Sequence, residues 1–132
     1  MKKVSEQWLN AAEDDLRVIR RIGDDDYLTH MVAFHSQQCI EKSLKAIIEE
    51  YELGHIRIHN LGRLFEVVKP QATFDVEVVL IEKLDKLYID ARYPGELGLL
   101  PNGKATLADA KEFHDFAKSI YEQVKGKLAG SQ

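Results

Sequence analysis

The sequence predicts an all-α fold, an antiparallel up-and-down bundle of four long helices plus one short helix, in a single domain over residues 1–132. Apolar residues recur at steps of three or four along most of the chain, which is the period of a helix that buries one face. Only 3 prolines interrupt the 132 residues, and runs that alternate β-branched and polar residues are few. A chain of this length can bury a core without disulfides.

Charge and cysteine content exclude several classes of protein. A formal net charge of −4 argues against a general nucleic-acid-coating protein, which needs a basic face, although it leaves room for a local basic pocket. The single cysteine, Cys39, can form neither an intramolecular disulfide nor a cysteine zinc site. The first residues lack the apolar region of a signal peptide, and no run reaches the roughly 18 apolar residues of a membrane-spanning helix. We therefore expect a cytoplasmic protein with no membrane partner.

The first helix is expected over residues 5–22, with Ser5 as its N-cap. Its apolar stripe follows helical spacing and comprises Trp8, Ala12, Leu16, Ile19 and Ile22. Gly23 is expected to end it, because the residue after a helix often takes a positive φ that glycine adopts without strain. The three acids at 24–26 suit the N-terminus of the next helix, and we interpret them as a cap rather than a metal site.

The second helix is expected over residues 26–53, with Gly54 as its stop. At 1.5 Å per residue it would be roughly 40 Å long, so it should be the spine of the bundle. Its inward face would carry Tyr27, Met31, Phe34, Ile40, Leu44 and Ile47. On or beside that face, however, lie Gln37, Gln38, Glu41, Lys42 and Lys45. Buried amides and carboxylates cost free energy unless they are paired, so either a partner helix supplies matching polar groups or a ligand binds there.

Three further helices complete the prediction. Asn60 caps a short helix that carries Leu61, Leu64, Phe65 and Val68 and ends before Pro70. The fourth runs from about Asp75 to Tyr93 with the stripe Val78, Ile81, Leu84, Leu87 and Tyr88, and Pro94 ends it. A long loop over 94–104 follows, and such loops are often functional. Thr106 and Asp109 resemble a capping box ahead of the last helix, whose inward face is Leu107, Ala110, Phe113, Ala117, Ile120 and Val124.

The end of the fourth helix is the second candidate feature. Arg92 and Tyr93 stand where this helix meets Pro94. An arginine fork can donate two hydrogen bonds to a phosphate or a carboxylate. The alternative is that Arg92 pairs with Glu41 or Asp90 and only orders the helix end. Residue type and spacing leave both open.

The five histidines suggest no metal site. His55 and His59 are four apart, but Gly54 and the cap Asn60 argue against a helix between them, and a third ligand is not evident. We expect His59 to be a loop residue bonded to a helix terminus, and we treat His30, His35 and His114 as ordinary helix-face residues. No metal and no cofactor are expected.

Four sequence blocks in this order are similar to the HEPN family of small helical domains. The blocks are Trp8 to Leu16, Tyr27 with Ala33 to Ala46, His59-Asn60-Leu61, and Ala91-Arg92-Tyr93-Pro94. The resemblance implies a bundle that dimerises and is often encoded beside a minimal nucleotidyltransferase, as in toxin and antitoxin pairs. It also implies that the protein is either a nucleotide-binding helper or a metal-independent ribonuclease.

The ribonuclease branch of that family places a histidine about four to six residues after an arginine that Arg92 resembles. Here that window holds Glu96, Leu97 and Gly98 and no histidine. RNA cleavage by the 2′-hydroxyl needs a group that titrates near neutral pH as well as a cation. Arg92 could supply only the cation, so His59 or another histidine would have to act from elsewhere in the fold.

Three hypotheses follow, in this order. The first is a binding module, a homodimer with a cleft for a nucleotide, an RNA end or a nucleotidyltransferase partner, lined by Gln38, Glu41, Lys45, Arg92 and Tyr93. The second is a ribonuclease toxin with a displaced histidine. The third is a structural protein whose dimer seam is fixed in register by Gln38 and Glu41, as isolated buried polar residues can do.

Overall fold

The structure, a computed structural model, describes the backbone of residues 1–92 and 105–130 and the side chains of all of these except 89–92. Its elements are α1 (Lys3–Ile22), the short 3₁₀ turn η1 (Asp26–Leu28), α2 (Thr29–Glu50), α3 (Leu61–Val68), α4 (Val78–Arg92) and α5 (Leu107–Gly130). Every element in the described ranges is helical, and α3 is the short one. The predicted all-α bundle of four long helices and one short helix is therefore confirmed.

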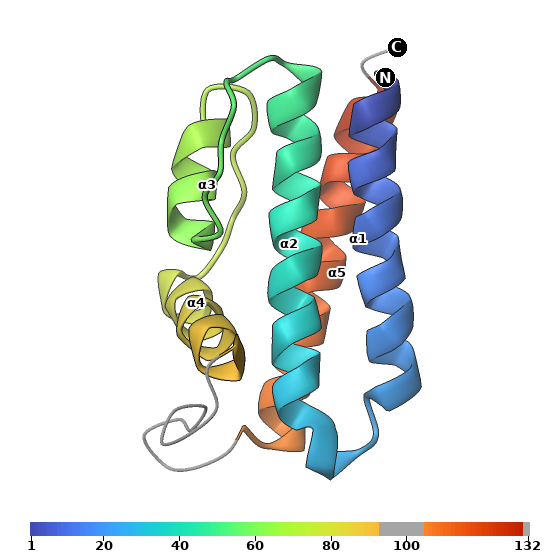
Figure 1. Cartoon of the computed structure of the whole chain (residues 1–132), viewed down its shortest axis with the longest axis vertical. Helices are drawn as coiled ribbons and strands as arrows, with labels where there is room; N and C mark the ends of the chain where they lie inside the picture. Colours follow the sequence, from blue (N-terminus) through green and yellow to red (C-terminus); the bar gives the residue numbers. More distant parts are fainter. Residues whose placement is uncertain (93–104, 131–132) are drawn as a thin grey trace.

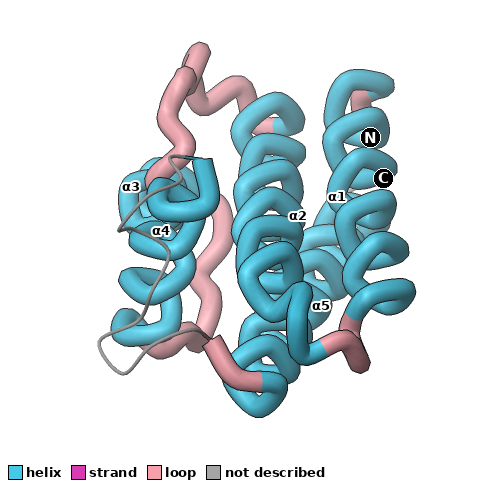
Figure 2. Tube along the Cα trace, turned by 60° about the horizontal axis from the view of Figure 1, so that its bottom comes forward, coloured by secondary structure: helices cyan, strands magenta, loops and turns pink. Residues whose placement is uncertain are grey.

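Helix α2 is the spine of the bundle, as the sequence predicts. It packs against α1, α3, α4 and α5. Figure 1 shows α1 on one side of α2, α3 and α4 on the other, and α5 behind. Helices α1 and α2 run in opposite directions, and α4 is seen nearly end-on where α1, α2 and α5 run along the long axis. In the turned view of Figure 2, α3 and α4 again stand together on one side of α2.

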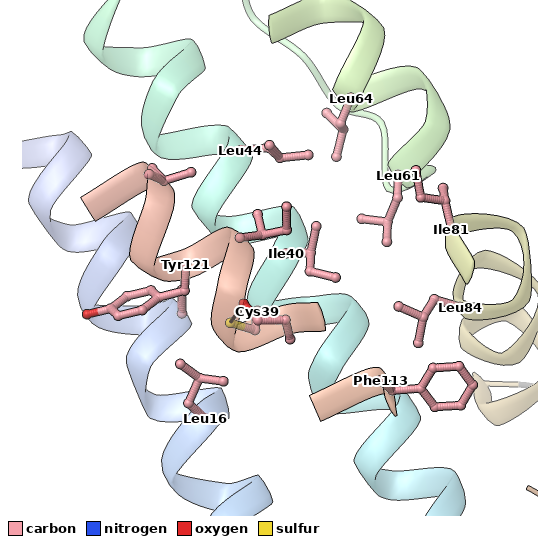
Figure 3. Close-up of a cluster of buried hydrophobic side chains, with 14 of the residues drawn as sticks. Leu16, Cys39, Ile40, Leu44, Leu61, Leu64, Ile81, Leu84, Phe113 and Tyr121 are labelled. Atoms are coloured by element: carbon pink, nitrogen blue, oxygen red, sulfur yellow. Dashed lines mark hydrogen bonds between the residues drawn. The ribbon is translucent and has the colours of Figure 1, made fainter. Parts of the chain in front are cut away.

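The core forms where α2 meets its neighbours. Ile40, Leu44 and Ile47 of α2 are fully buried, and each such side chain contributes about 1.5–3 kcal/mol relative to its exposed state. Figure 3 shows Ile40 and Leu44 between α5 and the leucines of α3, with Leu84 of α4 nearby. One continuous apolar cluster thus joins α1, α2, α3, α4 and α5.

Two helix starts have the predicted caps. The side chain of Asn60 accepts a hydrogen bond from the backbone N–H of Arg63 at 2.9 Å. Thr106 and Asp109 form a reciprocal box, in which the N–H of Thr106 donates to Asp109 Oδ2 at 2.9 Å and the N–H of Asp109 donates to Thr106 Oγ1 at 3.0 Å. Such caps satisfy N–H groups that have no partner inside the helix.

The first helix ends at Ile22 as predicted, but its start and the conformation of Gly23 differ from the prediction. It begins at Lys3, so Ser5 is a buried residue inside α1 and not its N-cap. The backbone N–H of Lys2 instead donates to Glu50 Oε1 at 2.8 Å, which ties the start of α1 to the end of α2. Gly23 has a φ of −61°, so the expected positive φ is wrong and Gly23 continues the right-handed turn.

The second helix is shorter than predicted. Residues 26–28 form the separate turn η1, which leaves Tyr27 75% exposed rather than inward. At the other end α2 stops at Glu50, because Glu52 takes a φ of 53° and the N–H of Leu53 bonds back to the carbonyl of Ile48 at 2.9 Å. This is the Schellman motif, whose left-handed position is usually occupied by glycine. Gly54, with φ 121°, follows two residues later.

The last two long helices each begin with an exposed apolar residue. Helix α4 begins at Val78 rather than near Asp75, and Val78 is mostly exposed. Leu107 at the start of α5 is also exposed, although the rest of the predicted α5 stripe is buried. Within residues 1–92 and 105–130, no helix combines the length and apolarity needed to cross a membrane. The predicted loop over 94–104 lies outside the described residues.

Candidate functional site on α2

The polar residues of α2 find their partners inside the same chain. Glu41 is buried, and its Oε2 accepts a hydrogen bond from Lys45 Nζ at 2.8 Å and lies 2.9 Å from His59 Nδ1. A buried carboxylate costs several kcal/mol unless charges and hydrogen bonds compensate it. Lys45 comes from the next turn of α2, and His59 comes from the connector over 51–60. The connector therefore supplies one of the polar partners that the sequence analysis expected from a partner helix or a ligand.

Gln37 completes this arrangement from a fully buried position. Its Nε2 donates to the backbone carbonyl of His59 at 2.8 Å and lies 3.3 Å from Glu41 Oε1. Its Oε1 accepts a hydrogen bond from Gln38 Nε2 at 2.8 Å. We call Gln37, Gln38, Glu41, Lys45 and His59 the Glu41 network. It fastens the connector to the middle of α2, so the sequence expectation that His59 bonds to a helix terminus is wrong.

His59 is the most open member of the network, with a side chain that is 53% exposed. The contact of Nδ1 with the carboxylate fixes the orientation of the ring and leaves Nε2 as the nitrogen that can meet a ligand. Lys45 is far less available. Its side chain is 12% exposed and its ammonium lies 5.4 Å from the ring centre of Trp8 on α1. Of the two cationic or polar partners of Glu41, the imidazole of His59 is the more accessible to a ligand.

Aromatic rings connect the network to α4. Tyr88 stacks on Phe34 of α2 with centroids 5.7 Å apart, and the ring of His59 lies 6.1 Å from that of Tyr88. Arg92 is the last residue of α4, one turn beyond Tyr88. The side chain of Arg92 and the whole of Tyr93 lie outside the described residues, so their predicted roles in the site stay predictions.

A second polar cluster, which is not among the predicted site residues, lies between α1 and α2. Asp15 is buried, and its Oδ1 lies 2.8 Å from His35 Nδ1 while its Oδ2 accepts from Lys42 Nζ at 2.8 Å. We call these three residues the Asp15 cluster. His35 is therefore not an ordinary helix-face residue. The signal was present in the sequence, because Asp15 interrupts the apolar side of α1 between Ala12 and Ile19.

The half-buried members of both clusters on α2, together with Phe34, form a line at helical spacing. We call it the open stripe of α2, and it consists of Phe34, His35, Gln38, Lys42 and Lys45. Helix α1 covers the Asp15 side, α4 covers the Tyr88 side, and α5 lies against Cys39. The remaining side of α2 is left partly exposed. Of the predicted site residues, the structure brings Gln38, Glu41 and Lys45 together here with His59.

Two other groups near the site take structural roles. Cys39 Sγ is buried against the backbone carbonyl of Ala117, and burial raises the pKa of this thiol to about 12, so it is no nucleophile. Asp85 of α4 accepts hydrogen bonds from the backbone N–H groups of Leu61 at 2.8 Å and Gly62 at 3.3 Å, at the start of α3. Burial raises the pKa of Asp85 and the Glu41 carboxylate adds to this, while the two N–H groups oppose it.

Comparison with known proteins agrees with this architecture. The family model of the HEPN domain matches residues 5–127. Among solved structures, that of ST0689, an archaeal HEPN homologue, is 27% identical, superposes with a TM-score of 0.70, and covers 96% of this chain and 99% of its own.

A second solved structure, TT1696 from Thermus thermophilus, is 22% identical with a TM-score of 0.66, over 96% of this chain and 99% of its own, and shows the same fold. No protein with a curated description matches the chain. The family model spans nearly the whole sequence, and the residues that it matches include both polar clusters. The chain belongs to the HEPN domain family.

Proposed function

We propose that the chain is a nucleotide-binding module that works as a homodimer, with the open stripe of α2 as the binding face. The observation that carries this proposal is His59, an imidazole that is 53% exposed yet held in one orientation by the buried Glu41 carboxylate. A half-exposed ring next to Tyr88, which itself stacks on Phe34, suits a nucleobase, which binds by stacking. Gln38 adds an amide that can recognise a base edge or a ribose hydroxyl.

The phosphates would lie toward the end of α4. Arg92 stands there one turn past Tyr88, which itself contacts the network. Its guanidinium is the natural partner of a phosphate, as the sequence predicts. A second copy, or a nucleotidyltransferase partner, would cover the exposed side of the open stripe. Sedimentation with and without a nucleotide distinguishes a homodimer from a monomer.

Isothermal titration of the full chain with ATP, other nucleotides and short RNAs tests the proposal. His59→Gln should reduce the affinity about tenfold, the effect of losing one oriented, charge-assisted contact. His55→Gln is the matched control, because His55 is exposed on the same connector and belongs to neither cluster. An absence of heat with every nucleotide at millimolar concentration would exclude the nucleotide function.

A ribonuclease is the second candidate, and one observation favours it. His35 and His59 each have Nδ1 against a buried carboxylate, and each carboxylate also binds a lysine, Lys42 or Lys45. Two such imidazoles could serve as base and acid in the attack of a 2′-hydroxyl, with a cation to stabilise the phosphorane-like charge. This is the displaced-histidine version of the activity.

RNA cleavage by the purified chain tests this second candidate. His35→Gln and His59→Gln should each lower the cleavage rate about 100-fold or more, the usual effect of losing a general acid or base, while His55→Gln should leave it unchanged. Arg92→Ala should also slow cleavage if Arg92 provides the cation. Equal rates in the wild type and all these variants would show that the cleavage comes from a contaminant.

The third hypothesis, a dimer seam fixed by Gln38 and Glu41, loses part of its support. Glu41 is satisfied by Lys45 and His59 of its own chain, so it does not require a group from a second copy. Of the two residues, Gln38, which is half-buried, is the one that could still reach across an interface. The double variant Gln38→Leu, Glu41→Leu should therefore change stability more than it changes the oligomeric state.

A further inference from the structure

A cavity of about 470 Å³ lies away from the open stripe, where the end of α1 meets the start of α5 beside α2. Its apolar part is made by Ile19, Val32, Leu107 and Ala110. None of the residues of the Glu41 network or the Asp15 cluster lines it. Its volume falls in the range of about 300–1,000 Å³ that is common for small-molecule sites. The cavity can therefore take a ligand independently of the proposed nucleotide function.

One cation at the rim of this cavity is available for a ligand. Arg20 of α1 lines the cavity and makes no hydrogen bond or ion pair with another residue in the described part of the chain. Lys111, also at the rim, is already paired with Asp115 at 2.9 Å. An acid, Asp24, stands at the rim as well, so the two basic and two acidic residues of the lining cancel, and Arg20 is the cation left without an ion-pair partner among the described residues.

His114 of α5 also lines the cavity. Burial lowers the pKa of His114 most, and Lys118, Arg20 and Lys111 lower it further, while Asp115 alone raises it. The folded chain therefore disfavours the charged form of this ring. Its Nε2 is enclosed and has no hydrogen-bond partner within the described residues. A negative charge held in the cavity would oppose this lowering of the His114 pKa.

We propose that this cavity binds a small organic carboxylate with an apolar body, such as an aromatic or branched-chain acid. The guanidinium of Arg20 would receive the carboxylate through its two parallel N–H donors. The apolar body would lie against Leu107, which is the exposed apolar residue of the lining. A monoanion fits better than a phosphate dianion, because Arg20 is the one unpaired cation among the described lining residues and Asp24 opposes further negative charge.

The test is a titration of the chain with benzoate and isovalerate, in which binding is monitored through amide chemical shifts and by calorimetry. Binding should shift the amides of Leu107 and Ala110, and benzamide, the neutral match of benzoate, should bind at least about tenfold more weakly. Arg20→Gln should cause a similar loss. Arg21→Gln is the control, since Arg21 carries the same charge at the next position of α1 but does not line the cavity.

The histidine provides a second readout. A bound anion favours the protonated imidazole, so it should raise the pKa of His114, and the affinity should increase as the pH falls. His114→Phe keeps a ring in place and removes an unsatisfied nitrogen, so the variant should fold and bind benzoate without this pH dependence. The proposal is overturned if benzoate shifts no amide at the cavity, if benzamide binds as well, or if Arg20→Gln and Arg21→Gln behave alike.

Discussion

Two buried carboxylates, one on each side of α2, are satisfied by the same kinds of group in different settings. Asp15 and its partners His35 and Lys42 all lie on two helices packed side by side. Glu41 binds Lys45 of its own helix and reaches His59, which belongs to the connector. The first cluster joins two rigid elements, and the second joins a rigid element to a loop.

The difference lies in how far each histidine is open. His35 is 22% exposed and His59 is 53% exposed, although both have Nδ1 on a carboxylate. A loop residue held by a buried charge combines access with a fixed orientation, which is the usual arrangement at binding sites. We infer that the Asp15 cluster mainly fixes α1 on α2, whereas the Glu41 network also presents a group to solvent.

The largest effect is expected from Glu41→Gln. Without the carboxylate charge, the ammonium of Lys45, which is 12% exposed, stays in a nearly buried position without an ion-pair partner. The free energy of unfolding should fall by about 3–5 kcal/mol, as when one member of a buried pair is removed. Urea denaturation measures it. Glu112→Gln, at an exposed position of α5, is the control and should change little.

Asp15→Asn should cost less, about 1–3 kcal/mol. Lys42 is 26% exposed and can turn its ammonium toward water when the charge of Asp15 is lost. The same denaturation experiment compares the two variants, with Asp14→Asn as the exposed neighbour. A greater loss for Asp15→Asn than for Glu41→Gln would contradict the view that the Glu41 network is the more enclosed of the two.

The sequence predicts these two clusters to very different degrees. The period of apolar residues is enough to predict the helices and the core. Asn60 and Thr106 are predictable as caps, because each is a residue type that bonds to the N–H groups of the helix it precedes. The polar residues of α2 also stand out, because they interrupt an apolar face. Their partners do not, since His59 is 18 residues away from Glu41 and reaches it through the path of the connector.

The Asp15 cluster and the end of α2 were also not predictable from residue spacing. The pairing of Asp15 with His35 depends on the rotation of α1 against α2, which no local pattern specifies. The predicted end of α2 at residue 53 is wrong, because Glu52 adopts a left-handed conformation that is more typical of glycine. Long-range geometry and tolerated backbone strain are therefore the parts of the site that spacing alone could not provide.

Replacing each histidine by glutamine tests the same comparison through smaller changes in the free energy of unfolding. His35→Gln should lower the free energy of unfolding by about 1 kcal/mol, because His35 is mostly enclosed by its hydrogen-bonded cluster. His59→Gln should lower it by about 0.5 kcal/mol or less, since solvent screens a half-exposed pair. Nucleotide affinity should show the opposite order. A variant series in which both properties follow the same order would mean that the two clusters do not differ in role.

The smallest effect is expected from Asp85→Asn, which tests a third carboxylate held by backbone N–H groups instead of side-chain cations. At neutral pH the change should stay below about 1 kcal/mol, because the loss of charge-assisted bonds to Leu61 and Gly62 is offset by relief of the burial penalty. The pKa of Asp85 is raised in the folded state, so the folded chain holds this proton more tightly than the unfolded chain does. Its contribution to stability is therefore complete below the unfolded pKa and is lost as the pH rises through the folded pKa. Urea denaturation across the acidic range should show the wild type gaining on Asp85→Asn as the pH falls, with exposed Asp75→Asn showing no such trend; a wild-type advantage that grows toward neutral pH would contradict the assignment.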